Sequence, residues 1–133
     1  MTLTKLLSYQ AGYALMGVAY NVISFFVVAS GGAPLSTTKP LVGGVSMALY
    51  GLALLPGVLG KIGLYRVLMG IAILVYGYGG IVKHLIIYSR TPELYASFSA
   101  WALAVGINVF GLVLNLMAVS GRFTMDGSPD RSA

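Results

Sequence analysis

The sequence contains no cysteine, a single histidine and only three acidic residues among its 133. Without cysteine the chain forms no disulfide, ligates no iron–sulfur cluster and holds no cysteine-ligated zinc. One histidine excludes a bis-histidine haem within the chain. The acids Glu93, Asp126 and Asp130 make no paired-carboxylate or metal-ligand pattern. We therefore predict a non-catalytic protein with no metal site and no cofactor.

Charge is scarce along the whole chain, because only 8% of residues are charged and the mean hydropathy is +0.90. Soluble domains carry about 25% charged residues. Residues 6–38, 40–60, 67–82 and 94–121 carry no charge at all. A helix of about 20 apolar residues crosses a bilayer, and in lipid the backbone must satisfy its own hydrogen bonds. These runs predict an all-α integral membrane four-helix bundle, with helices at about 9–30, 41–60, 64–87 and 94–120.

The bundle is expected to form one domain over residues 1–121, followed by a polar, mobile tail over 122–133. The basic residues stand singly near the expected helix ends, as interfacial anchors do, so we predict no nucleic-acid partner. Four of them are expected to bind lipid head groups, namely Lys39, Lys61, Arg66 and Arg122. Five of the eight cations lie on the side that holds both termini, which predicts cytoplasmic termini, or their organellar equivalent.

A short echo links the two halves of the sequence. LMGVA (15–19) matches LMGIA (68–72), and YGLAL (50–54) matches FGLVL (110–114). Both matches join equivalent helices of two successive hairpins, so the bundle would consist of two tandem hairpins in the same orientation. Chance similarity between segments built from Leu, Val, Ala and Gly explains the matches equally well.

Small and polar residues recur on one face of each predicted helix. Because hydrophobicity does not drive association in lipid, close packing of small residues and a few polar contacts must hold the bundle. The stripes are Gln10, Ala14, Gly17, Asn21 and Ser24; Gly44, Ala48 and Gly51; Gly70, Gly77 and Gly80; and Ala96, Ala100, Ala104, Asn108, Gly111 and Asn115. Gly17, Gly70 and Gly111 are expected to allow close helix approach.

The three asparagines allow two interpretations. They either bond across helices inside a packed bundle or line a polar track for a hydroxyl-rich or head-group substrate. No acid lies within the spans, which counts against proton-coupled transport. If a site exists, Asn21 facing Asn108 is where we expect it, with Asn115 further along the same stripe. His84 is expected at the interface beside Lys83, and Pro56 is expected near a kink or the end of the second helix.

Residues 13–26, YALMGVAYNVISFF, resemble the first helix of the GtrA-like small four-helix membrane proteins. The resemblance implies movement of polyprenyl-linked sugars. The Asn-Arg-aromatic ending of that family's second helix is absent from LPGVLGKIGLYR, so no functional residue is carried over.

Two functions follow from the sequence. The first is an accessory or structural subunit of a larger membrane complex of respiratory or photosynthetic type, which contributes helix packing and lipid binding. The alternative is a small oligomeric transporter or a lipid-linked-sugar flippase. The expected partners are membrane lipids and either other integral membrane subunits or further copies of this chain.

Overall fold

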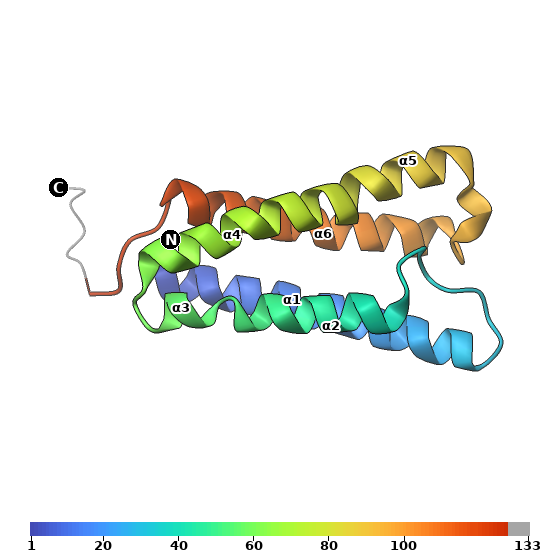
Figure 1. The fold of residues 1–133 in the computed structure, drawn as a ribbon, viewed down its shortest axis with the longest axis horizontal. Coiled ribbons are helices and arrows are strands. Elements are labelled where there is room, and N and C mark those ends of the chain that lie inside the picture. Colours follow the sequence, from blue (N-terminus) through green and yellow to red (C-terminus); the bar gives the residue numbers. More distant parts are fainter. Residues whose placement is uncertain (128–133) are drawn as a thin grey trace.

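Four long helical segments make up the computed structural model, which describes residues 1–127 (Figure 1). The first is α1 (Leu3–Ala29), and the last is α6 (Phe98–Ser120). Between them lie the spans Pro40–Val58 and Ile62–Arg90. All four are long and apolar enough to cross a membrane. The described residues form no strand, so the all-α four-helix bundle predicted from the charge-free runs is confirmed.

The helix ends differ from the predicted ones because side chains near the ends cap the backbone. α1 begins at Leu3 rather than at residue 9, since the Thr2 hydroxyl accepts from the Lys5 backbone N–H at 3.4 Å. α6 begins at Phe98 rather than at 94, since the Ser97 hydroxyl accepts from the Ala100 N–H at 3.0 Å. Such caps satisfy backbone donors that have no partner in the first turn.

The second span is broken near Pro56. α2 (Pro40–Leu52) ends four residues before this proline, and the short α3 (Leu55–Val58) follows. Proline has no N–H to donate to the carbonyl of Leu52, so the helix cannot continue unbroken. Gly57 lies in the bend, where an added Cβ would crowd Leu7 and the Tyr65 ring. The break lets the chain pack closely against α1 before it turns back.

The third span contains a π-helical turn. α4 (Ile62–Gly77) runs into η1 (Tyr78–Val82), and α5 (Lys83–Arg90) completes the span. The Lys83 N–H donates to the Tyr78 carbonyl, which is the i to i−5 bond of a π turn. Such turns are often found at functional sites. A short 3₁₀ segment, η2 (Pro92–Leu94), then leads into α6.

The helices pack as two pairs. α1 packs along α2, α4 packs along α6, and α1 joins the pairs through α6. α2 and α4 are not packed along their length, and the pairs diverge toward the end that holds the connection 31–39 (Figure 1). The two pairs are successive hairpins, as the sequence echo suggests.

The inward faces follow the predicted stripes in α1 and α6 only. Gln10, Ala14, Gly17 and Ser24 are buried, as are Ala100, Ala104, Gly111 and Asn115, while Ala96 precedes α6 and is exposed. The prediction for the second helix is wrong, because Ala48 is exposed and the inward face consists of Gly43, Met47, Tyr50 and Leu54. In α4 the buried face is Tyr65, Met69 and Ala72. Large side chains therefore fill the bundle where small ones were expected.

The chain after α6 returns to the start of α1. Gly121 adopts the left-handed conformation (φ 70°) that ends many helices, and Thr124 then pairs with the N-terminal segment. The Thr124 N–H donates to the Met1 carbonyl at 3.0 Å, and the Leu3 N–H donates to the Thr124 carbonyl at 2.9 Å. Asp126 accepts from the Thr4 N–H at 3.1 Å and from its hydroxyl at 2.6 Å. We call these contacts the terminal clasp. Residues 122–127 therefore differ from the expected mobile tail, of which 128–133 lie outside the described residues.

Candidate functional site

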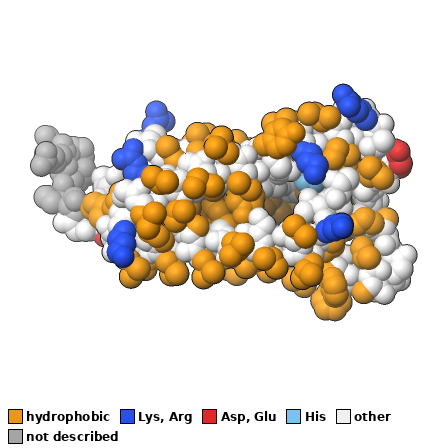
Figure 2. All heavy atoms as spheres, in the orientation of Figure 1, with side chains coloured by type: hydrophobic (Ala, Val, Ile, Leu, Met, Phe, Trp, Pro, Cys, Tyr) orange, Lys and Arg blue, Asp and Glu red, His pale blue; other side chains and the backbone are white. Residues whose placement is uncertain are grey.

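A cleft lined by both polar and apolar residues lies between the diverging helix pairs. Its volume is about 230 Å³, and residues of α1, α2, α4, η1, α5, α6 and the connection 31–39 line it. Figure 2 shows the surface hollowed beside the histidine at this end of the molecule. The polar lining residues are Tyr20, Asn21, Ser36, Thr38, Ser46, Tyr76, Lys83, His84 and Asn108. Asn21 and Asn108, expected to face each other, thus share one cleft.

The two asparagines are held in the same way on opposite walls. Asn21 Nδ2 donates to the Gly17 carbonyl, and Asn108 Nδ2 donates to the Ala104 carbonyl, each at 2.8 Å. Each amide also lies against a glycine of the neighbouring helix, since a Cβ at Gly43 would overlap Asn21 and one at Gly80 would overlap Asn108. The asparagines therefore do not bond each other. They fix two amide groups in the walls of the cleft.

Three tyrosines pack together beside the cleft, and one of them, Tyr76, lines it. The rings of Tyr13, Tyr50 and Tyr76 meet edge to face, with centroid distances of 4.9, 5.6 and 6.2 Å, and we call them the tyrosine cluster. The Tyr13 hydroxyl donates to Asn108 Oδ1 at 3.1 Å, and the Tyr76 hydroxyl donates to the Ser46 carbonyl at 2.8 Å. Edge-to-face contacts between buried rings are favourable beyond the area they bury. The cluster ties all four helical segments together below the cleft.

A second polar group, the inner network, lies beyond the tyrosine cluster. Gln10 Nε2 donates to Asn115 Oδ1 at 3.0 Å, and the Tyr50 hydroxyl donates to the same oxygen at 2.7 Å. The Tyr65 hydroxyl donates to Gln10 Oε1 at 2.6 Å. Asn115 Nδ2 is the one buried side-chain nitrogen or oxygen in the described residues that has no partner. Hydrogen bonds of this kind hold membrane helices together.

Neither the burial of Tyr13 and Tyr65 nor the partners of these polar groups was predicted from the sequence. Tyr13 and Tyr65 lie near the predicted helix boundaries, a position typical of an interfacial aromatic belt, yet both are fully buried. The burial of Tyr13 could have been recognised from its spacing, because Gln10, Tyr13 and Gly17 follow one another at helical intervals on the same face. The partners on α2, α4 and α6 cannot be read from that spacing.

His84 points into the cleft and not to the interface, with 4% of its surface exposed. Its Nδ1 bonds the Tyr95 hydroxyl at 2.7 Å, and its Nε2 lies 3.5 Å from the Thr38 hydroxyl. Its carbonyl accepts from Trp101 Nε1 at 3.2 Å. The histidine thus links α5 to both connections at this end. Among residues 1–127, no three His, Cys, Asp or Glu side chains come together as a metal site requires.

The three glycines predicted to allow close approach differ in their surroundings. A Cβ at Gly17 would overlap the Met47 side chain, and one at Gly111 would overlap the Tyr13 ring. At Gly70 a Cβ would meet only Val119 Cγ2, at 3.9 Å. The close approach expected at Gly70 is therefore not found, since such a Cβ would make only an ordinary van der Waals contact.

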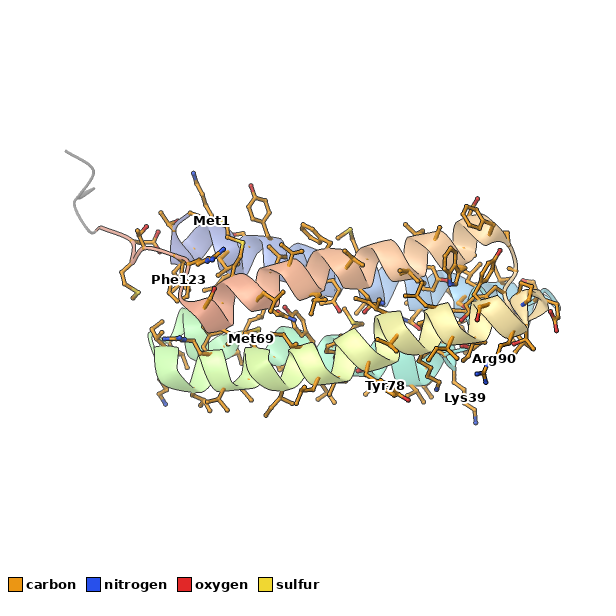
Figure 3. All side chains as sticks on the ribbon, turned by 90° about the horizontal axis from the view of Figure 1, so that it is seen from above. Met1, Lys39, Met69, Tyr78, Arg90 and Phe123 are labelled. Carbon is orange, nitrogen blue, oxygen red and sulfur yellow. The ribbon has the colours of Figure 1, made fainter. Side chains whose placement is uncertain are left out.

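The cations predicted to bind lipid are all exposed. Lys and Arg side chains gather at the two ends of the molecule, with an apolar band between them (Figure 2). Lys39 lies at the cleft end together with Arg90, whereas Met1 and Phe123 mark the other end (Figure 3). Arg66 has an additional role, because its Nε and Nη2 donate to the Val119 carbonyl at 3.0 and 2.6 Å near the end of α6.

Comparison with known proteins gives no relative from which a function can be carried over, since no protein family, curated protein or solved structure matches this chain. The resemblance of residues 13–26 to GtrA-like proteins thus has no support from a family match.

Proposed function

We propose that this chain is a small membrane transporter or flippase that takes the polar head of a lipid-linked molecule into the cleft. The observation that carries the proposal is a set of polar side chains within the cleft, combined with an exposed apolar rim. Val42 and Val75 line the cleft from α2 and α4, and both are largely exposed. A head group in the cleft would keep its hydrocarbon chain between these helices, in the apolar layer.

The depth of the cleft suits a head group drawn inward from the surface. Ser46 lies two helical turns beyond Lys39, which corresponds to roughly 10 Å along the helix. If Lys39 lies at the membrane surface, the cleft reaches about a third of the way into an apolar layer of about 30 Å. A polar group at that depth needs hydrogen-bond partners, which the walls supply.

Beyond the tyrosine cluster the inner network continues the polar line toward the terminal end. Transfer across the membrane requires the tyrosine rings to part, so that a substrate passes from Asn108 to Asn115. Neither asparagine titrates, which fits movement without coupling to protons.

The test is transbilayer movement in proteoliposomes. Purified protein is reconstituted with one of three lipids that carry a fluorophore on the hydrocarbon chain. The first has a phosphoglycerol head, the second has a neutral sugar head, and the third is a polyprenyl phosphate. A membrane-impermeant quencher then measures arrival in the outer leaflet. We expect faster movement of at least one probe than in protein-free liposomes, and rates no faster than in protein-free liposomes for all three probes would overturn the proposal.

A matched pair of variants assigns the movement to the cleft. Asn21→Leu removes the wall amide and keeps the number and branching of the side-chain heavy atoms, and Val22→Leu changes the next, exposed residue of the same helix. We expect the first to slow movement at least tenfold and the second to leave it unchanged. Thermal midpoints in detergent verify that both variants fold. Equal rates for the two variants would exclude the cleft as the route.

The cytoplasmic placement of the termini is likewise a proposal, and it puts the cleft in the opposite leaflet. The absence of cysteine provides a direct test. Ser89→Cys marks the cleft end and Ser120→Cys marks the terminal end. In intact cells, an impermeant maleimide should label the first variant only. Labelling of the second variant alone would reverse the orientation.

A second candidate function is the accessory subunit of a larger membrane complex. It is favoured by glycines that face outward, because added Cβ atoms at Gly12, Gly63 and Gly106 would meet open space. Small residues on a lipid-facing surface allow another helix to approach closely. Gentle extraction and native mass measurement separate the two functions, since a homo-oligomer alone would exclude the accessory role.

A further inference from the structure

The charge at the mouth of the cleft has one sign. Lys83 is the one cation among the lining residues, and no Asp or Glu belongs to that set. Of the described acids, Glu93 lies in the exposed η2 segment, and Asp126 is bonded to Thr4 in the terminal clasp. The lining therefore supplies nothing that would neutralise the ammonium group of Lys83.

The start of α2 adds to this positive field. Pro40 has no N–H, and the first intrahelical bond of α2 runs from the Gly43 N–H to the Lys39 carbonyl. No side chain caps this end, so the N–H groups of Leu41 and Val42 have no partner within the helix. Val42 and Gly43 both line the cleft. A helix N-terminus favours anions, and here it lies at the same cavity as Lys83.

Asn21, Ser46 and Tyr76 supply neutral polar groups deeper in the cleft. Asn21 Oδ1 faces Gly43, and the hydroxyls of Ser46 and Tyr76 lie 2.9 Å apart on opposite walls. Hydroxyl and amide groups bind glycerol or sugar hydroxyls by neutral hydrogen bonds. The cleft thus has a positive mouth, a neutral interior and an apolar side opening.

We infer that the cleft selects a phosphate-bearing lipid head group over a neutral one. The inference rests on the proposed function, which requires only that a polar head enters the cleft. The phosphate lies at the mouth, between Lys83 and the first turn of α2. The uncharged part of the head reaches toward Asn21, and the hydrocarbon chains leave past Val42 and Val75. A charge-assisted contact with phosphate is stronger than a neutral hydrogen bond.

The one tryptophan of the chain reports on this site. Trp101 stacks on Tyr88 at 4.3 Å and donates to the His84 carbonyl, so its environment depends on the wall that carries Lys83. Its fluorescence is measured in detergent while one of three probes is added. The probes are short-chain phosphatidylglycerol, a short-chain glycosyl diacylglycerol and inorganic phosphate.

We expect phosphatidylglycerol to bind at least tenfold more tightly than the glycosyl lipid and at least tenfold more tightly than inorganic phosphate. Lys83→Gln should weaken phosphatidylglycerol binding about tenfold, Lys83→Arg should restore it, and Lys5→Gln at the opposite end should leave it unchanged. Lys83 is exposed, so its replacement does not disturb packing, which the thermal midpoint verifies.

The outcomes separate the inference from the proposed function. Equal affinity for the two lipids, or affinity that does not depend on Lys83, would overturn the preference for phosphate and leave head-group binding standing. If inorganic phosphate binds as tightly as phosphatidylglycerol, the inference that the bound phosphate belongs to a lipid is overturned. If no probe binds, the proposed function fails together with the inference.

Discussion

Replacing Gly111 by alanine should destabilise the bundle, although alanine is the better helix former. The added Cβ would overlap the Tyr13 ring, which is fully buried between Tyr50 and Tyr76. Since the ring has no free space to enter, it must move away from α6. The movement breaks the bond from its hydroxyl to Asn108.

The magnitude follows from three contributions. Overpacking a well-packed core costs about 1–3 kcal/mol. Loss of one hydrogen bond inside a membrane protein costs about 0.6 kcal/mol. The change from glycine to alanine within a helix returns about 1 kcal/mol. The expected net loss in free energy of unfolding is therefore about 0.5–2.5 kcal/mol, as the sum of these terms.

Gly106→Ala is the matched control on the same helix. A Cβ at Gly106 meets nothing within 4 Å, so only the helix-propensity gain of up to about 1 kcal/mol applies. Reversible denaturation in mixed micelles, followed by circular dichroism, measures both variants. We expect them to differ by about 1.5–3.5 kcal/mol on this reasoning. A difference below about 0.5 kcal/mol, the scale of ordinary surface substitutions, would refute the packing of Tyr13 against α6.

Three further predictions concern the inner network, the sequence echo and the terminal clasp. In a double-mutant cycle, Tyr50→Phe and Asn115→Leu should show a coupling of about 0.6–1.7 kcal/mol in unfolding free energy, and additive effects would mean that the bond between them contributes nothing. Gly17→Ala should lower the thermal midpoint because it crowds Met47, whereas Gly70→Ala should leave the midpoint unchanged or raise it; equal shifts would contradict the unequal spacing. The hydrogen bonds from Thr4 lower the pKa of Asp126 below its usual value, so the clasp contributes stability above about pH 4 and loses it as the pH falls through the lowered pKa. Proteolysis of the N-terminal segment should therefore increase at low pH, and Asp126→Asn should remove this pH dependence.

The bundle could be predicted from the sequence because a backbone in lipid must satisfy its own hydrogen bonds, which a helix does within one segment. Each charge-free run had to form a helix, and the stripes of α1 and α6 followed from helical spacing alone. Asn21 and Asn108 could be paired because both stripes place them at a similar depth from the cleft end. The ends of helices were less predictable, since capping by Thr2 and Ser97 is decided by local geometry.

The rest of the site depends on contacts between distant segments. Tyr13 was expected near a surface, but Gly111 on α6 leaves room for its ring inside the bundle. His84 was expected beside Lys83 at the interface, but the preceding π turn and Tyr95 hold it inward. The divergence of the two helix pairs, which creates the cleft, leaves no mark in the hydropathy of any single helix.

The terminal clasp sets the order in which the protein is completed during synthesis. The first turn of α1 finds its partners in Thr124 and Asp126, which leave the ribosome after all four membrane segments. The N-terminal turn must therefore wait, unpaired, while three further segments enter the membrane. Translation of the segment after α6 is then the step that supplies the partners of the first turn of α1.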